Sequence, residues 1–396
     1  MTWPPARPGG FPLPYVLNER DVLLGFVLGV STPSGRPLPP SGPRPREALA
    51  KLLADALARG PCLVTFSGGR DSSAVLAAAL DVARREGLPE PVPLTLRYPG
   101  AAGTDETAWQ ELVVGHLRPS SWEVVELAPE SSQLLGPVAT KSLAAHGLLW
   151  PPAIHRDTAW LERARGATVL TGEGGDEIFG PHRATPLRSL AHRLRHSPDG
   201  LGWPLLRGLA KEGAPRPLRA YLARRKLALA SSLAWLRPPA RQEAIDQFAR
   251  LDVDEQWSWR QAIREHLEWP ALVIALANRD WMGASYGARW LHPLLDRGFV
   301  DSVARAGGPL GYPGRSEAMR ATFGDLLPDA VLSRTTKASF NTAFHGQATR
   351  EFAQGWEGAG VDPELVDVEV LRSMWLADRV HAGTDALLQA AWLASR

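Results

Sequence analysis

Residues 62–73 read CLVTFSGGRDSS, a short apolar run that passes directly into a turn rich in Ser and Gly. The run 62–66 is apolar except for Thr65, which predicts a buried strand. Residues 73–85 are rich in Ala and Leu at helical spacing, so a helix is expected directly after the turn. A strand, a Gly-rich turn and a helix in direct succession are typical of parallel α/β sheets.

The alternation of strand and helix continues on both sides of this stretch. Further strands are predicted at 92–98, 122–127 and 168–171, and further helices at 46–59, 105–117 and 158–165. Helices of this length between strands imply parallel β-α-β units. The predicted fold class is therefore α/β, with a doubly wound parallel sheet covered by helices on both faces.

The chain divides into four segments by composition. Residues 1–45 contain 11 Pro and are interpreted as a Pro-rich extended leader with little fold of its own, apart from one strand or helix within 22–30. No strand is predicted after Gly180, so an all-helical C-terminal half is expected to cover the carboxyl edge of the sheet, where open α/β sheets bind ligands. The other three segments are an α/β core at 46–180, a basic helical insertion at 181–270, and a helical C-terminal part at 271–396.

The composition excludes several classes of protein. The chain is 44% hydrophobic and 22% charged, as globular proteins are. Its single cysteine, Cys62, excludes a disulfide framework, a cysteine-rich zinc site and a Cys-ligated iron–sulfur cluster. Because we find neither a membrane-spanning apolar run nor the apolar core of a signal peptide, a cytoplasmic protein without membrane contact is expected.

The basic residues are unevenly distributed. The formal net charge is +2, but residues 182–227 hold nine Arg and two Lys against Asp199 and Glu212, a local net charge of +9. Phosphate backbones attract such surfaces, whereas most Arg-rich helical faces are simply solvated. The stretch lacks the interleaved aromatic residues of a single-strand binder, so nucleic acid is not the expected partner.

The turn 67–73 has the residue types that bind phosphate. Gly68 and Gly69 allow a tight turn that brings backbone N–H groups against an anion, and the start of the next helix adds partial positive charge. Asp71 would repel a phosphate by itself, which implies a bridging Mg²⁺. Three serines supply hydroxyl donors: Ser67, Ser72 and Ser73.

The spacing within the turn distinguishes two kinds of phosphate loop. The Gly-x-x-x-x-Gly-Lys spacing of a Walker loop is missing. Residues 67–72 instead resemble the Ser-Gly-Gly-x-Asp-Ser loop of ATP pyrophosphatases, which cleave ATP between the α and β phosphates. The alternative is a turn that only caps a helix.

A second motif follows the predicted strand at 168–171. Residues 169–180 read VLTGEGGDEIFG and place three acidic residues in a Gly-rich turn at the same edge of the sheet. Clustered acids repel one another unless a cation or an amine lies among them. The stretch resembles the Gly-Glu-Gly-x-Asp-Glu motif of the synthetase domain of the asparagine synthetase family; taken alone it could also be a helix cap.

The second half of the chain resembles the same family in order. The stretches that carry this resemblance are 279–282, 292–296, 315–320, 327–328 and 334–340, and the whole resemblance covers residues 46–345. It implies a fold of the ATP pyrophosphatase type. In this family ATP and a carboxylate give an acyl adenylate and pyrophosphate, and an amine then attacks the adenylate.

The resemblance assigns roles to individual residues. Asp71 and Asp176 match the family's Mg²⁺ ligands. Lys337, one of only five lysines, matches a Lys near the phosphates, where it would stabilise charge; otherwise it is a Lys at a helix end. Glu173 matches the carboxylate that deprotonates the amine in amide-forming members, so we assign it as general base. The residues expected to contact ATP, as a substrate, and its pyrophosphate are Phe66, Ser67, Gly68, Gly69, Asp71, Ser72, Ser73, Leu96, Thr171 and Gly172.

Two departures from the family pattern affect the substrate. Thr2 stands where glutamine-hydrolysing members carry a catalytic Cys, and fewer than 70 residues precede Ser67, so no glutaminase domain is expected. Cys62 is more typical of strand packing than of a reactive thiol. The amine would then be free ammonia, ammonia from a separate amidotransferase partner, or an amine carried by a substrate.

The second departure lies before Asp296. Arg289 and Leu291 stand where many members have an acidic residue and then Arg, which puts aspartate in doubt as the carboxylate. Residues 290–296 are similar to lasso-peptide cyclases, which join a side-chain carboxylate to a peptide N-terminus, and β-lactam synthetases carry Tyr in place of Glu173.

The motifs and the departures from the family pattern leave four functions open. The leading hypothesis is an ATP- and Mg²⁺-dependent amide-forming ligase acting on a small-molecule or peptide carboxylate, with a precursor peptide as one candidate partner. A cyclase-like lactam synthetase, a tRNA-modifying enzyme and a non-catalytic nucleotide-binding scaffold are the alternatives. The intact acidic residues and Lys337 disfavour the scaffold, because clustered charges are costly to keep.

Overall fold

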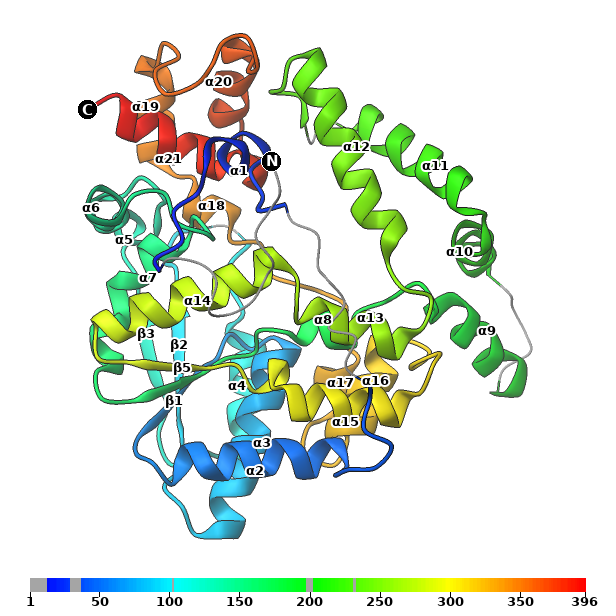
Figure 1. Cartoon of the computed structure of the whole chain (residues 1–396). Coiled ribbons are helices and arrows are strands. Elements are labelled where there is room, and N and C mark those ends of the chain that lie inside the picture. The colour runs from blue at the N-terminus through cyan, green and yellow to red at the C-terminus, as the bar shows by residue number, and fades with distance from the viewer. Residues whose placement is uncertain (1–12, 29–36, 102, 197–201, 231–232) are drawn as a thin grey trace.

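The computed structural model describes residues 13–28, 37–101, 103–196, 202–230 and 233–396. Its sheet has five parallel strands in the order β3-β2-β1-β4-β5 (Figure 1). The strand order runs outward in both directions from the centre, so the predicted doubly wound α/β sheet is confirmed. The strands are β1 Cys62–Thr65, β2 Val92–Arg97, β3 Glu123–Glu126, β4 Thr168–Leu170 and β5 Arg289–Leu291.

Strand β5 shows that the expectation of no strand after Gly180 is wrong. It pairs in parallel with β4, with Trp290 opposite Val169. The backbone N–H of Arg289 donates to the carbonyl of Ala167 at 3.0 Å. A three-residue strand shows too little alternation to be distinguished from the helical sequence around it.

The sheet is covered on both faces, because successive residues of a strand point to opposite sides. Val64 of β1 belongs to a core formed with α2 (Pro45–Leu57), α3 (Arg70–Glu86), α4 (Thr107–Leu117) and α15 (Arg297–Gly307). Its neighbour Leu63 belongs to a separate core formed with α7 (Ile154–Leu161) and α14 (Pro270–Ser285).

The remaining helices belong mostly to the second half of the chain. Short helices connect the strands: α5 Pro129–Ser132, α6 Pro137–His146, η1 Glu162–Ala164 and α8 Gly175–Phe179. Helix α13 Trp259–His266 precedes the C-terminal part, which contains η3 Pro293–Leu295, α16 Arg315–Phe323, α17 Asp329–Leu332, α18 Asn341–Phe344, α19 Gln347–Gly355, α20 Val368–Leu376, η4 Ala382–Thr384 and α21 Asp385–Ala394. Within the described ranges, no helix has both the length and the apolar character needed to cross a membrane.

The N-terminal segment is more ordered than expected. Residues 19–24 form helix α1 (Glu19–Leu24), whose Val22 and Leu24 are buried in a third core with α19, α20 and α21. The N–H of Leu17 donates to the carbonyl of Leu148 at 2.7 Å. The expectation of little fold before residue 46 is therefore wrong for residues 13–28, while 1–12 and 29–36 lie outside the described residues.

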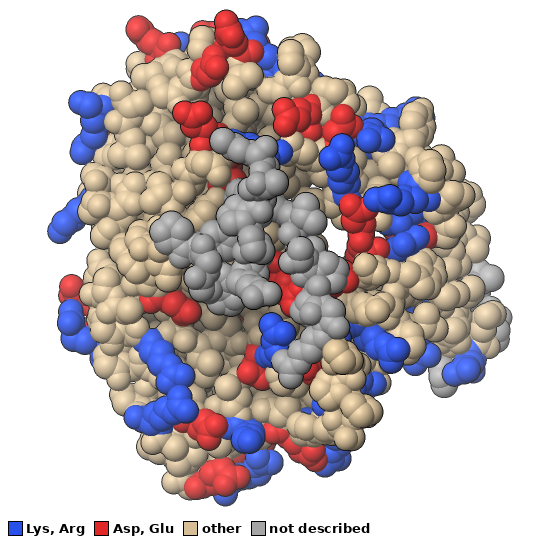
Figure 2. Space-filling model, viewed as in Figure 1, with Lys and Arg blue, Asp and Glu red and all other residues tan. Residues whose placement is uncertain are grey.

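Helices α9 to α12 form a basic arm that projects from the body (Figure 1). They are α9 Thr185–His196, α10 Trp203–Gly213, α11 Arg216–Leu229 and α12 Pro238–Asp254. Acidic residues of α12 pair with the arginines of α11, as in the 2.6 Å contact of Arg224 Nε with Asp246 Oδ1. Charges of both signs are accordingly interspersed over the arm (Figure 2).

The arm is attached at its base to the acidic motif. His182 Nε2 lies 2.9 Å from the carbonyl oxygen of Glu177, and its Nδ1 lies 2.9 Å from Glu255 Oε1, directly after α12. At the other end, the N–H of Arg237 donates to the carbonyl of Leu365 at 2.8 Å. The arm therefore connects the acidic motif with the C-terminal helices.

Phe179 joins the acidic motif to the core of the sheet. It is 2% exposed, and its ring makes edge-to-face contacts with Phe299 and Phe323 at centroid distances of 6.4 and 6.0 Å. Phe179→Ala is expected to lower the free energy of unfolding by about 3–5 kcal/mol, because it removes a buried ring and leaves a cavity. Urea denaturation checks this, with Leu229→Ala, 78% exposed, as a control that should change stability by less than about 0.5 kcal/mol. Equal effects of the two substitutions would contradict the assigned role of Phe179.

Candidate active site

A cavity of about 540 Å³ lies at the carboxyl ends of β1, β2 and β4. Three segments far apart in the sequence line it: the predicted phosphate loop, the acidic motif and residues 334–340. The predicted residues that it brings together are Phe66, Ser67, Gly69, Asp71, Ser72, Leu96, Thr171, Gly172, Glu173, Asp176 and Lys337. Gly68 and Ser73 are not among the lining residues, and Ser73 is fully buried.

The phosphate loop has the shape that an anion site requires. Gly68 adopts φ +82°, in the left-handed region that favours glycine. Ser67 Oγ accepts a hydrogen bond from the Gly69 N–H at 3.3 Å, and Ser72 Oγ donates to the Gly69 carbonyl at 3.2 Å. Helix α3 starts at Arg70 without a side-chain cap, so the N–H groups of its first turn remain available to a phosphate oxygen.

Two glycines of the acidic motif allow it to lie directly against this loop. A Cβ on Gly172 would lie 2.6 Å from the backbone nitrogen of Ser72, and one on Gly175 would lie 2.1 Å from Asp71 Cγ. Real Cβ atoms do not approach so closely, so any side chain here would separate the two segments. The glycine spacing of the motif therefore brings Asp71 close to Asp176.

Arg315, at the start of α16, bridges these two carboxylates. Its Nη2 donates to both oxygens of Asp71 at 2.7 and 2.6 Å, and its Nη1 bonds Asp176. Lys337 Nζ donates to the other oxygen of Asp176 at 3.1 Å. The Lys predicted to lie near the phosphates is thus beside the predicted metal ligands.

The two acids respond differently to this environment. Desolvation raises the pKa of Asp71, and Arg315 only partly offsets it. Desolvation also acts to raise the pKa of Asp176, but hydrogen bonds from Arg315 and Lys337 outweigh it and lower that pKa. Asp176 is therefore ionised at neutral pH.

The segment that carries Lys337 is held by a second arginine. Arg334 and Glu106 form a buried bidentate ion pair at 2.5 and 2.6 Å, and Arg334 Nη1 also donates to the Gly68 carbonyl at 3.3 Å. Its guanidinium lies 4.5 Å from the centroid of the Trp109 ring. A planar guanidinium suits such bidentate and stacked contacts, so Arg334 fixes residues 334–340 beside the phosphate loop.

Glu173 faces a different part of the cavity from Asp176. Its Oε1 lies 3.1 Å from Arg279 Nη1 of α14, and its N–H donates to Thr171 Oγ1 at 3.3 Å. Thr171 Oγ1 lies 2.8 Å from His292 Nδ1. Burial, with a contribution from Arg279, lowers the pKa of His292 to about 3, so the imidazole is neutral. The same cavity is also lined by four aromatic side chains: Tyr98, Trp160, Trp290 and Phe340.

The carboxylates fit Mg²⁺ bound together with phosphates. No group of three or more His, Cys, Asp or Glu suited to a metal occurs among the described residues. Mg²⁺ is commonly held by one or two carboxylates and completed by substrate phosphates. Asp71 and Asp176, which reach one guanidinium from opposite sides next to the phosphate loop, are such a pair.

Two residues predicted to affect the substrate lie outside the cavity, and four residues of the site were not predicted. Arg289 and Leu291 both belong to β5, and neither lines the cavity. Cys62 is buried, and burial raises the pKa of its thiol to about 11, as expected for a packed strand residue. The missed residues are Arg279, Arg315, Arg334 and Glu106. The first three lie in stretches that carry the family resemblance, which was the only available signal for them.

A doubly wound sheet with a pyrophosphate-type loop and paired acids at its switch point defines an α/β protein of the ATP pyrophosphatase class. The family model described as asparagine synthase matches residues 45–393, and the chain belongs to that family. The match extends the resemblance beyond residue 345 and supports a general activity, that of an ATP-dependent ligase that forms amide bonds. No curated protein sequence gave a match.

Gly175→Ala tests the contact between the two loops. The new Cβ would collide with Asp71, so the affinity for pyrophosphate in the presence of Mg²⁺ is expected to fall at least about tenfold. Isothermal titration calorimetry measures this. Gly115→Ala in α4 is the control, because nothing lies within 4 Å of its new Cβ. An unchanged affinity in Gly175→Ala would show that loop contact does not control anion binding.

Proposed function

We propose that the protein joins a carboxylate to an amine through an acyl adenylate, with AMP and pyrophosphate as by-products. One observation carries this proposal: the phosphate loop, the acid pair and Lys337 line the same cavity as Glu173, which faces away from the acid pair toward α14. Two half-reactions need such an arrangement, one at the α-phosphorus and one at the activated acyl carbon.

In the first half-reaction, a substrate carboxylate oxygen attacks the α-phosphorus of ATP and the bond to the β-phosphate oxygen breaks. The N–H groups at the start of α3 and the hydroxyls of Ser67 and Ser72 bind the pyrophosphate oxygens. Lys337 adds positive charge, so the charge that develops on the leaving group is stabilised electrostatically. Asp71 and Asp176 would hold Mg²⁺, which supplies further charge neutralisation when bound.

In the second half-reaction, the amine nitrogen forms a bond to the acyl carbon, and the bond from that carbon to the AMP oxygen breaks. The amine loses a proton to Glu173, which acts as general base. Arg279 positions the Glu173 carboxylate through their 3.1 Å contact.

The cavity lining favours a substrate with apolar or aromatic groups. Tyr98, Trp160, Trp290 and Phe340 line the same cavity as Glu173. Trp290 lies in β5 between Arg289 and Leu291, which stand outside the lining at the positions of the family's usual acidic residue and Arg. A substrate as small and polar as aspartate would leave these rings unused. We therefore propose that the amine is part of an organic substrate, as in lactam or peptide cyclisation, and not ammonia from an amidotransferase.

Product analysis tests the activity. The protein is incubated with ATP, Mg²⁺ and carboxylates labelled with ¹⁸O, including aspartate with ammonia and peptides with a free amine. Formation of AMP and pyrophosphate, with one ¹⁸O transferred to AMP, is the expected result. ADP and phosphate as products, or AMP without the label, would contradict an acyl adenylate, and asparagine formation would contradict the substrate proposal.

Glu173→Gln should separate the two half-reactions. Amide formation is expected to fall by about 10²–10⁴, because general base catalysis is lost, whereas carboxylate-dependent exchange of pyrophosphate into ATP continues. Exposed Glu111→Gln in α4 is the control, with neither rate changed. An equal fall in both rates would show that Glu173 has a structural role instead.

A further inference from the structure

Arg315 occupies the position between Asp71 and Asp176 where a cation would be bound. The guanidinium takes up both oxygens of Asp71 through Nη2 and one oxygen of Asp176 through Nη1. Its side chain is only 16% exposed, and its Nε is buried without a hydrogen-bond partner in the described structure. The arginine thus offsets part of the charge of the two carboxylates, and Lys337 pairs with the other oxygen of Asp176.

This arrangement conflicts with direct binding of a divalent cation. An ionised carboxylate accepts hydrogen bonds on the same lone pairs with which it coordinates a metal. The Arg315 contacts therefore have to be broken before the two acids can coordinate an ion. A guanidinium also binds phosphate oxygens in a planar, bidentate way. The phosphate loop that would supply these oxygens is directly adjacent, because Asp71 belongs to it.

We propose that Arg315 is an exchangeable counter-ion that moves from the two carboxylates to the phosphates of ATP. Without nucleotide it pairs with Asp71 and Asp176 and keeps divalent cations out. With nucleotide it binds phosphate oxygens, which frees both oxygens of Asp71 and Oδ1 of Asp176 to coordinate the accompanying cation, while Lys337 stays at Oδ2 of Asp176. Nucleotide and divalent cation consequently bind as a pair. The proposal rests on the proposed function only in naming ATP as the ligand.

Two binding constants with opposite responses test the exchange. Mn²⁺ is titrated into nucleotide-free protein and followed by electron paramagnetic resonance. Arg315→Ala is expected to bind Mn²⁺ at least about tenfold more tightly than the unmodified protein, because the two carboxylates lose the counter-ion that they share and only Lys337 remains, on Asp176. The same variant is expected to bind pyrophosphate with Mg²⁺ at least about tenfold more weakly, because it loses a phosphate ligand.

Arg320→Ala is the matched control, since Arg320 lies on the same helix and pairs with exposed Asp329. It should change neither constant. If Arg315→Ala fails to fold, Arg315→Lys replaces it in both titrations. This variant keeps the charge and loses the bidentate contact, so smaller changes of the two affinities in the same directions are expected. Mn²⁺ affinity that is unchanged or weaker in the variant would overturn the proposal. Neither titration contains a carboxylate substrate, so the outcome is independent of whether an acyl adenylate forms.

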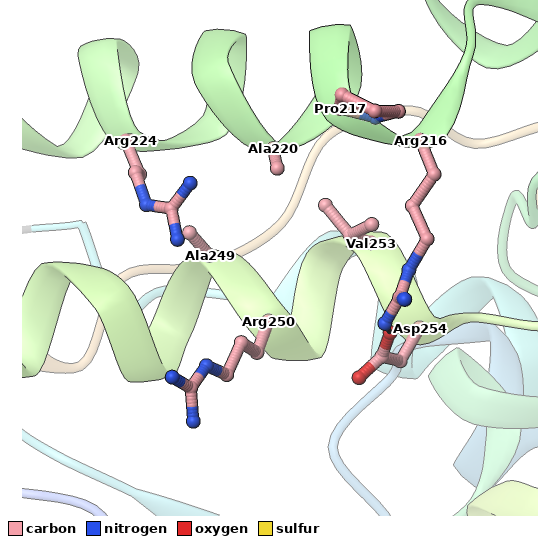
Figure 3. Close-up of a pocket in the computed structure, with 8 residues that line it drawn as sticks. All are labelled: Arg216, Pro217, Ala220, Arg224, Ala249, Arg250, Val253 and Asp254. Carbon is pink, nitrogen blue, oxygen red and sulfur yellow. Dashed lines mark hydrogen bonds and ion pairs between the residues drawn. The ribbon is translucent and has the colours of Figure 1, made fainter.

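A second inference rests on a groove in the basic arm. Helices α11 and α12 line a cavity of about 290 Å³ in which Ala220 of α11 and Val253 of α12 point into the gap, while Arg216 and Arg224 extend across it (Figure 3). Ala249 and Pro217 complete its apolar lining. None of its lining residues is aromatic, so it offers no stacking surface for a nucleic acid base.

The surface of α11 combines positive charge with exposed apolar side chains. The helix carries four Arg and one Lys and no acidic residue. Arg216 and Arg224 are paired with Asp254 and Asp246 of α12, so the cations offered to a partner are Arg225 and Lys226 of α11 and Arg250 of α12. Leu218 and Tyr221 on the same helix are 48% and 57% exposed. Exposed apolar residues among like charges are typical of a surface that binds a partner of opposite charge.

We propose that this groove is the docking site of an acidic peptide segment that inserts an apolar side chain between α11 and α12. Its carboxylates pair with Arg250, which lines the groove, and with exposed Arg225, the next residue after Arg224 on α11. The arm is attached to the acidic motif through His182, so a peptide bound here is held by an element in direct contact with the candidate active site.

Fluorescence anisotropy with two labelled peptides of equal length tests the docking site. One alternates Glu and Leu, and the other alternates Lys and Leu; only the acidic peptide should bind. Ala220→Trp, which fills the groove, and Arg225→Glu are each expected to weaken binding at least about tenfold, and exposed Arg379→Glu outside the arm should not. Lack of binding by the acidic peptide would overturn the proposal. A single-stranded RNA that binds more tightly and is insensitive to Ala220→Trp would also overturn it, in favour of a nucleic acid surface.

Discussion

The contact between the phosphate loop and the acidic motif is the constraint on which the rest of the structure depends. Gly172 and Gly175 bring the motif so close to residues 71–72 that two carboxylates lie next to each other. Such a pair is unfavourable without a counter-charge. Arg70 of the α/β core acts on Asp71 only through its charge. The two cations that contact the carboxylates directly come from the C-terminal part, as Arg315 of α16 and Lys337.

This requirement explains why the second half of the chain folds over the sheet edge. Buried Phe299 of α15 and Phe323 of α16 fix those helices against Phe179, directly after the acidic motif. The ion pair of Arg334 with Glu106 holds residues 334–340 against the N-terminus of α4, the helix that precedes β3. Apolar packing and charge neutralisation thus act at the same edge, and neither half of the site is complete without the other.

The sequence predicts what is locally encoded. The predicted strand 62–66 and helix 73–85 follow from side-chain spacing and correspond to β1 Cys62–Thr65 and α3 Arg70–Glu86, although the helix begins three residues earlier than predicted. The loop residues of the cavity come from the same stretch. Strand β5 was missed because its three residues receive their pairing from β4, more than a hundred positions earlier. The strand or helix allowed within 22–30 is helix α1, which lies earlier, at 19–24; its position and type depend on its partners in the core, α19, α20 and α21. Arg315 and Arg334 could not be distinguished from many other arginines, because their roles depend on Asp71 and Glu106, which only the folded chain brings to them.

The acidic motif itself has two faces, and this determines from which side an amine must arrive in the proposed reaction. Gly174 adopts φ +94°, so the backbone reverses between Glu173 and Asp176. Asp176 therefore turns to Arg315 and Lys337, whereas Glu173 turns to Arg279 of α14. In the proposed reaction Glu173 takes a proton from the amine and therefore has to contact it, while the phosphates lie beside Asp176. On that proposal the amine approaches from the side of α14, so the shape of that region, and not the phosphate loop, selects the substrate.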